Sequence, residues 1–277
     1  MRSSGILLIF IALIVTGCFN QPSNGEDKFT TTINEQEDVI NSHGMIVKNL
    51  KKLDAFIKNK AGKQRVVHYT IEGDPIFNDL KYTDQGIEMR HDNSEDTFGS
   101  PQVTTYTCQN LVRNETDKLL SYTLTGCEGE QAKIELLQIP FDVTKQDKFE
   151  FVLKYGVNQK NEINTIEKKL VKDLQNGEVV EVSDFEFSEQ ERGQIYKEMV
   201  LANYLGEKEL STECNRKPAV SYDLSIQINS GERHYQWTEC QNTVDDGQMT
   251  ELAQAIIKIV QDGSIYKQLP EVKGYYE

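Results

Sequence analysis

The sequence lacks the short motifs that identify many enzymes and cofactor-binding proteins. It contains no GxSxG, no P-loop and no GxGxxG. None of its cysteine spacings is CxxC, and its histidines show no HxxxH or HExxH spacing: His43, His68, His91 and His234. We therefore predict no cofactor, no metal ligands and no catalytic residues from motifs.

Basic residues are also in short supply. The chain has 30 Lys and Arg against 44 Asp and Glu, a formal net charge of −14. Such a chain has no positive surface for phosphate backbones, which argues against nucleic acid as a partner. Anionic lipid headgroups should repel the body of the protein in the same way.

Only one long apolar run is present, Ile6–Val15, after a positive start at Arg2. As a helix this run would extend about 15 Å, half of a bilayer core of roughly 30 Å. It ends in Val-Thr-Gly-Cys at Cys18, the pattern of a lipoprotein signal. We predict a signal peptide over residues 1–17, acylation of Cys18 (diacylglyceryl and palmitate-type chains) and a flexible linker over 18–33. The anchor would hold the protein on the extracytoplasmic face of the cell membrane. The alternatives are a signal peptide without lipid and a buried helix.

Four cysteines remain once Cys18 is assigned to lipid, namely Cys108, Cys127, Cys214 and Cys240. An even number outside the cytoplasm favours two disulfides, for which three pairings are possible. We expect one bridge in each half of the chain, Cys108–Cys127 and Cys214–Cys240. A symmetric hairpin turning near Glu115 would place Cys108 opposite Thr123, so the first bridge needs a bulge, a shifted register or a longer loop.

The hydrophobic pattern predicts an α+β fold of two small units, each an antiparallel sheet with flanking helices. The first unit, 34–145, begins with helical spacing between Asp38 and Lys60 that is interrupted at residues 42–44. We expect a short helix, a break and a second helix there. Alternation from Arg65 onward then predicts a meander of strands that includes one from Val103 to Leu111.

The second unit, 146–277, starts with a strand at Phe149–Tyr155. A type I′ turn at Asn176-Gly177 should follow, then a helix opened by a capping box of Ser188 and Glu191. Further expectations are a hairpin turning at residues 230–231, a last helix ending at Gly263, and an aromatic tail over 269–276 that packs back.

The stretch YTIEGDPI at residues 69–76 resembles the signature of an uncharacterised family of lipoproteins from Gram-positive bacteria. Similar segments are residues 42–44, 92–100, 106–108 and 122–127, so the resemblance covers about residues 34–130. The family is a domain of unknown function. The resemblance therefore implies a lipoprotein setting and no particular activity.

Two acidic segments are the candidate binding sites. Glu72 and Asp74 flank a glycine where a strand breaks, and their oxygens suit a hard cation or a ligand amine. The structural alternative is a turn, with Gly73 at an unusual φ and Asp74 bonding backbone amides. Asp92 and Asp96 belong to a second acidic loop, which either binds a cation or is a solvated surface.

The leading hypothesis is a non-enzymatic binding module of the cell envelope, engaging another envelope protein or a small ligand. One alternative is a cation-binding protein. Another is an envelope hydrolase that uses the carboxylates near Glu72 and Asp74. Apolar or aromatic patches, clustered oxygens and a deep pocket would distinguish these three in a structure.

Overall fold

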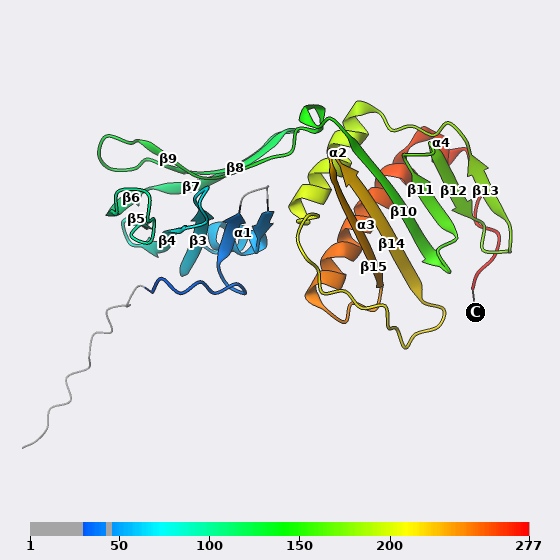
Figure 1. Cartoon of the computed structure of the whole chain (residues 1–277), viewed down its shortest axis with the longest axis horizontal. Helices are drawn as coiled ribbons and strands as arrows, with labels where there is room; N and C mark the ends of the chain where they lie inside the picture. Colours follow the sequence, from blue (N-terminus) through cyan, green and yellow to red (C-terminus); the bar gives the residue numbers. More distant parts are fainter. Residues whose placement is uncertain (1–29, 43–45, 277) are drawn as a thin grey trace, which may run out of the picture. The chain divides into compact units, whose positions relative to one another are not determined.

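A computed structural model describes residues 30–42 and 46–276. The chain divides into two units, Met1–Thr32 and Ile33–Glu277, and every helix and strand described lies in the second. The predicted signal peptide, Cys18 and His43 lie outside the described residues. Among the described residues, no helix is long and apolar enough to cross a membrane. The fold is α+β, as predicted, and the described residues form three sheets (Figure 1).

The first sheet has six strands in the order β2-β1-β3-β4-β5-β6. The elements are β1 (Val39–Ser42), β2 (Ile46–Lys48), α1 (Leu50–Asn59), β3 (Lys63–Tyr69), β4 (Pro75–Thr83), β5 (Gly86–Asp92) and β6 (Val103–Cys108). β1 runs parallel to β3, whereas all other neighbours are antiparallel. The meander β3–β6 therefore places the β3–β4 and β5–β6 loops at the same end of the sheet.

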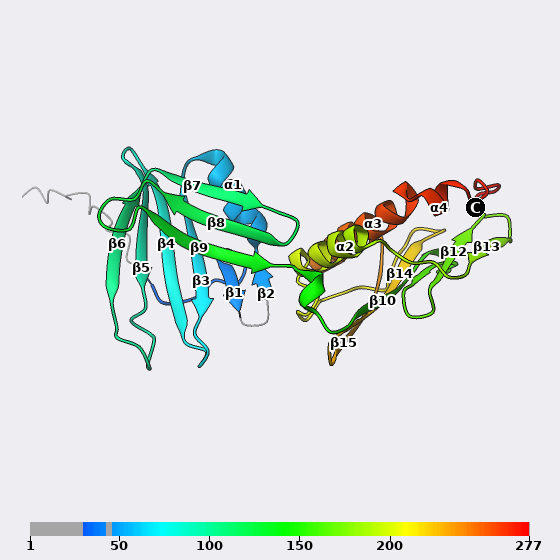
Figure 2. The ribbon, with the colours of Figure 1, turned by 90° about the horizontal axis from the view of Figure 1, so that it is seen from above.

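The second sheet consists of β7 (Asn110–Glu115), β8 (Leu119–Thr125) and β9 (Lys133–Pro140). Figure 2 shows β8 and β9 crossing over the strands of the first sheet. The two sheets and α1 enclose one core, in which six of the buried side chains are Leu53, Phe56, Leu80, Met89, Tyr122 and Leu124. We call β1–β9 with α1 the N-terminal lobe.

The C-terminal lobe follows a short 3-10 turn, η1 (Val143–Lys145). Its elements are β10 (Phe149–Val157), β11 (Asn161–Asn164), β12 (Lys169–Asp173), β13 (Val179–Val182), α2 (Glu189–Leu201), β14 (Val220–Ile228), β15 (Gly231–Thr238), α3 (Val244–Asp262) and α4 (Ser264–Lys267). The strands form one antiparallel sheet, β13-β12-β11-β10-β14-β15. Its helices lie on one face (Figure 2), where Phe149 meets Tyr196 of α2 and Trp237 bonds Thr250 of α3. The predicted domain boundary at 145/146 stays a prediction.

Local sequence signals correctly placed several elements of this lobe. Ser188 and Glu191 form the reciprocal capping box at the start of α2. β14 and β15 form the expected hairpin, and α3 ends at Gly263. The tail packs back as predicted, because the backbone N–H groups of Lys273 and Gly274 both donate to the carbonyl of Leu174.

Three predictions were wrong in detail. The first helix expected after Asp38 is the strand pair β1–β2, because adjacent Val39 and Ile40 are both buried and so cover opposite faces of a strand. The strand expected over Val103–Leu111 breaks at Gln109, where the chain passes from the first sheet to the second. The β12–β13 hairpin has a longer loop than a type I′ turn, since Leu174 N–H donates to the carbonyl of Glu178 across residues 175–177.

Both expected cysteine pairs, Cys108–Cys127 and Cys214–Cys240, are disulfide-bonded. The first is explained by the register of β7 and β8, in which Asn110 lies opposite Thr125. Two residues further out, the same register places Cys108 opposite Cys127. The shifted register arises because the turn follows Thr116, whose N–H bonds the carbonyl of Leu119, and is not centred near Glu115.

Candidate functional site

The β3–β4 loop, residues 70–74, is a closed turn that projects two side chains. Thr70 N–H donates to the Asp74 carbonyl at 2.9 Å, and Gly73 N–H donates to the Thr70 carbonyl at 3.0 Å. Gly73 has φ +97°, in the region that favours glycine. The turn leaves Ile71 at 88% exposure, with Glu72 beside it also exposed.

The β5–β6 loop, residues 93–102, is held by carboxylates and an amide. Asp92 Oδ1 accepts from Ser94 N–H at 2.9 Å. Asp96 Oδ1 accepts from the N–H groups of Phe98 and Gly99 at 3.0 and 2.9 Å. Asn93 spans the base of the loop, where its Oδ1 accepts from Gln102 N–H at 2.6 Å. Phe98, near the middle of this hydrogen-bonded loop, is 76% exposed.

One carboxylate oxygen joins the two loops. Asp74 Oδ2 accepts from the backbone N–H of Thr97 at 2.8 Å and from its hydroxyl at 2.6 Å. The two bonds stabilise the ionised form, so they hold the pKa of Asp74 below its usual value. We call residues 70–74 and 93–102 together the paired loops.

The predicted binding residues therefore share one end of the first sheet but serve different roles. Asp74, Asp92 and Asp96 bond backbone amides, which is the structural alternative considered for Asp74. Of the four predicted residues, Glu72 alone is exposed, whereas Asp74 and Asp96 are half-buried and Asp92 is buried. Among the described residues no group of three or more His, Cys, Asp or Glu side chains is placed to hold a metal ion.

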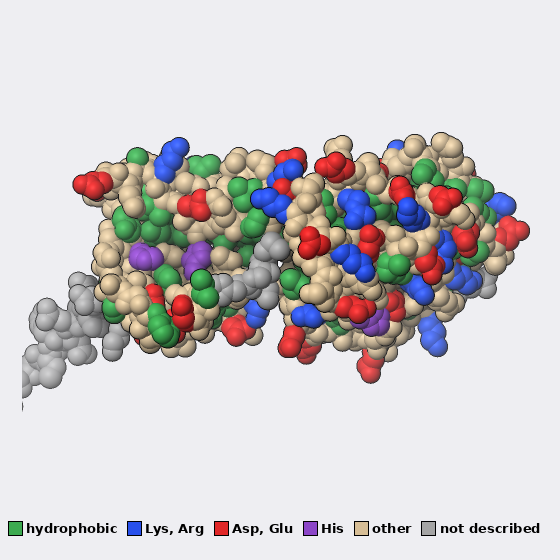
Figure 3. Space-filling model, turned by 45° about the horizontal axis from the view of Figure 1, so that its top comes forward, with side chains coloured by type: hydrophobic (Ala, Val, Ile, Leu, Met, Phe, Trp, Pro, Cys, Tyr) green, Lys and Arg blue, Asp and Glu red, His purple; other side chains and the backbone are tan. Residues whose placement is uncertain are grey.

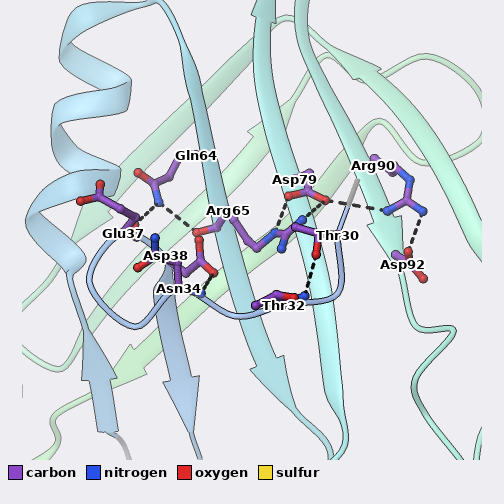
Figure 4. Close-up of polar contacts among 10 residues, drawn as sticks. All are labelled: Thr30, Thr32, Asn34, Glu37, Asp38, Gln64, Arg65, Asp79, Arg90 and Asp92. Carbon is purple, nitrogen blue, oxygen red and sulfur yellow. Dashed lines mark hydrogen bonds and ion pairs between the residues drawn. The ribbon is translucent and has the colours of Figure 1, made fainter. Parts of the chain in front are cut away.

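A ladder of charged side chains supports the paired loops from the outer face of β3–β5 (Figure 4). Arg65 Nε donates to Asp79 Oδ1 at 2.6 Å, and Arg90 donates to Asp92 Oδ2 at 2.6 Å. Asp79 also lies 3.8 Å from Arg90, which joins the two pairs. Burial alone would raise the pKa of Asp92, but its bonds from Ser94 and Arg90 lower it overall. The ladder thus fixes the carboxylate that starts the β5–β6 loop.

Two histidines lie on the opposite face of the same strands. Asn41 Nδ2 is 3.1 Å from Nδ1 of His68, and His91 Nδ1 is 2.8 Å from Asn78 Oδ1. Because an amide nitrogen only donates, His68 accepts at Nδ1 and carries its proton on Nε2. Figure 3 shows histidine side chains beside hydrophobic ones on this side of the lobe. Burial lowers the pKa of both histidines, so both are held neutral.

The sequence did not single out the two residues that the structure makes most conspicuous, Ile71 and Phe98. Ile71 belongs to the YTIEGDPI stretch and Phe98 to the segment at residues 92–100, and neither was predicted to be exposed. The available signal was an apolar residue within two positions of both an acidic residue and a glycine, a pattern that also occurs in buried turns.

Residues 36–123 match the model of a domain of unknown function, DUF4362. The match extends from the segment before β1 into β8 and includes both paired loops. It confirms the predicted resemblance to an uncharacterised domain family, while the YTIEGDPI signature and the lipoprotein setting stay predictions. No curated protein and no solved structure matches the chain.

The neutral histidines predict a loss of stability in mild acid. Their folded pKa values lie below 6.5, the ordinary value, so the unfolded chain binds protons first as pH falls. The free energy of unfolding should be constant above about pH 7.5 and decrease below about pH 6.5, by about 1.4 kcal/mol per unit of pKa shift.

Urea unfolding at pH 7.5 and 5.5 checks this for the wild type and for His68→Gln. The variant should lose less stability between the two pH values than the wild type. Val112→Ala, at an exposed position on β7 without a titratable side chain, is the control and should behave as the wild type. An equal loss in His68→Gln and the wild type would contradict the assignment.

Proposed function

We propose that this protein is a lipid-anchored module of the Gram-positive cell envelope that binds another envelope protein through the paired loops. The observation that carries the proposal is the pair of apolar side chains, Ile71 and Phe98, exposed at 88% and 76%. Each lies on a loop that internal hydrogen bonds hold in shape. Rigid exposed apolar side chains are typical anchors of protein interfaces, since little conformational entropy is lost when they are buried.

The charge around these anchors indicates the kind of partner. Glu72, Asp74, Glu95 and Asp96 belong to the same two loops, and no Lys or Arg does. An acidic rim disfavours anionic lipid and favours a protein surface that carries Lys or Arg beside an apolar pocket. Because Ile71 and Phe98 are largely exposed, a protein surface also suits them better than a small ligand does, since small ligands bind in concave pockets.

The two alternative functions have less support from the geometry. A cation site needs several converging oxygens, whereas Asp74, Asp92 and Asp96 each direct an oxygen to a backbone amide. A hydrolase needs two carboxylates that face a common point in a pocket, and Asp74 instead bonds Thr97. The paired loops therefore favour docking.

The anchor is tested at Cys18. We expect Cys18→Ala to move the protein from the membrane fraction to the soluble extracellular fraction, because acyl chains supply the membrane affinity. The measurement is fractionation of cells that produce either form, followed by detection of the protein. A Cys18→Ala variant that stays in the membrane would contradict the proposed lipid anchor and would leave the docking proposal unaffected.

The docking surface is tested by photo-crosslinking in the membranes of the producing cell. A benzophenone amino acid in place of Phe98 should form a discrete adduct with one protein. The same probe at Val112, 45% exposed on β7, is the control and should not give that adduct. Adding Ile71→Asp should reduce the adduct roughly tenfold, as expected when an interface anchor is lost.

Ile71→Asp changes an exposed position, so circular dichroism should show an unchanged fold. The proposal is wrong if the benzophenone at 98 labels lipid, if positions 98 and 112 give the same products, or if Ile71→Asp leaves the adduct unchanged. A captured protein without a basic surface would contradict the predicted charge complementarity.

A further inference from the structure

The last strand of the first sheet, β6, is an edge strand without the usual protection. It ends the strand order and pairs with β5 alone (Figure 2). Bulges, prolines and charged residues commonly protect such edges. β6 pairs without a bulge and contains no proline, and no charged residue occurs between Asp96 and Arg113. Every other strand that ends a sheet in the described residues contains a charged residue, such as Lys48 in β2, Arg113 in β7, Lys133 in β9, Glu181 in β13 and Glu232 in β15.

Two hydrogen bonds show which backbone groups of β6 face outward. Asn93 N–H donates to the carbonyl of Gln102 at 3.1 Å, so even-numbered residues bond to β5. Odd-numbered residues therefore direct their backbone groups away from the sheet. Thr107 agrees with this alternation, because its carbonyl accepts from the N–H of Glu128 at 2.9 Å, outside the first sheet.

The outward groups form a short row that is incomplete at both ends. Val103 and Thr105 each present an N–H and a C=O, for which no backbone partner is found among the described residues. At one end, the C=O of Pro101 also points outward, because the next N–H, that of Gln102, is directed to Asn93 Oδ1. Pro101 has no N–H to present. At the other end, Thr107 presents its N–H, since its C=O is already bonded to Glu128.

This incomplete row is complementary to itself. In an antiparallel pairing about a two-fold axis at Thr104, Val103 of one copy lies opposite Thr105 of the other, and the two residues exchange two hydrogen bonds. Pro101 then lies opposite Thr107, where the N–H of Thr107 can bond the C=O of Pro101. The bond that would be missing joins the N–H that Pro101 lacks to the C=O that Thr107 already uses. Every outward group of the row thus has a partner.

The absence of charge on β6 also favours a second copy as the partner. In a two-fold pairing, a charged side chain on the strand would lie close to the same charge on the other copy, and such pairs are destabilising. The formal net charge of −14 opposes the approach of two whole chains. None of that charge lies on β6, and salt screens the rest. Because each copy has used its uncharged edge, the assembly stops at two copies.

We propose that β6 is a self-association surface, through which two copies of this chain join their first sheets into one continuous antiparallel sheet with Thr104 opposite Thr104. The bonds to Val103 and Thr105 form its centre. The exposed side chains Ile71 and Phe98 take no part in it, so the proposal does not depend on the function proposed for the paired loops.

Cysteine cross-linking of the full chain in intact producing cells tests this register. Facing residues at a non-hydrogen-bonded position such as Thr104 have Cα atoms about 4.5 Å apart, within reach of a disulfide. After mild oxidation, Thr104→Cys should give a species of twice the chain mass on a non-reducing gel. Thr105→Cys is the matched control. Its counterpart lies on the diagonal at about 7–8 Å, so the product should be roughly tenfold less.

A mixed pair keeps the test decisive if Thr104→Cys fails to fold. Chains with Val103→Cys and chains with Thr105→Cys, produced together with different tags, should link to each other, because facing Cα atoms at a hydrogen-bonded position are about 5.5 Å apart. Neither variant should link when it is produced alone. Absence of the mixed product would overturn the proposal.

Three further results would also overturn it. The first is a Thr104→Cys product no more abundant than that of Thr105→Cys. The second is a Thr104→Cys product that contains another protein in place of the second copy. The third is a smaller product at high salt, since screening of two acidic chains should increase pairing through backbone bonds.

Discussion

One carboxylate oxygen of Asp74 accepts two hydrogen bonds from Thr97. These bonds determine the surface that the N-terminal lobe exposes at the β3–β4 and β5–β6 loops. Without them, the β3–β4 turn and the longer β5–β6 loop would be separate segments, each free to move on its own. With Thr97 bonded at 2.8 and 2.6 Å, they form one surface that carries Ile71 and Phe98. The same bonds direct the Asp74 carboxylate to its neighbour, which is why an acidic turn here favours docking over cation binding.

The hydrogen bonds between the two loops depend on the strands from which the loops extend. Arg65, Asp79, Arg90 and Asp92 link β3, β4 and β5 on one face, and Asp92 then bonds the first turn of the β5–β6 loop. Removal of one partner from a mostly buried ion pair leaves an unpaired charge, which is costly. The ladder therefore couples the position of the β5–β6 loop to the stability of the first sheet.

Much of this fold follows from local sequence. The capping box at Ser188 and the alternation in β14 act within a few residues, so the sequence alone located α2 and the last hairpin. The wrong predictions concern segments whose structure is decided by contacts between residues far apart in the sequence. Val39–Lys48 is too short for periodicity to separate helix from strand. No local sequence signal marks Gln109 as the residue at which the chain passes from the first sheet to the second. For the site, the sequence located the acidic loops but not their purpose, because the bond from Thr97 to Asp74 joins residues far apart in the chain.

Amide hydrogen exchange at Thr97 tests the central claim, that the paired loops form one ordered surface, most directly. In the wild type this amide should be protected, although the loop is exposed. In Asp74→Ala its exchange should be roughly tenfold faster, because the acceptor is gone. Glu72→Ala, two residues away in the same turn, should leave the rate unchanged. An unprotected Thr97 amide in the wild type, or equal rates in Asp74→Ala and Glu72→Ala, would contradict the account.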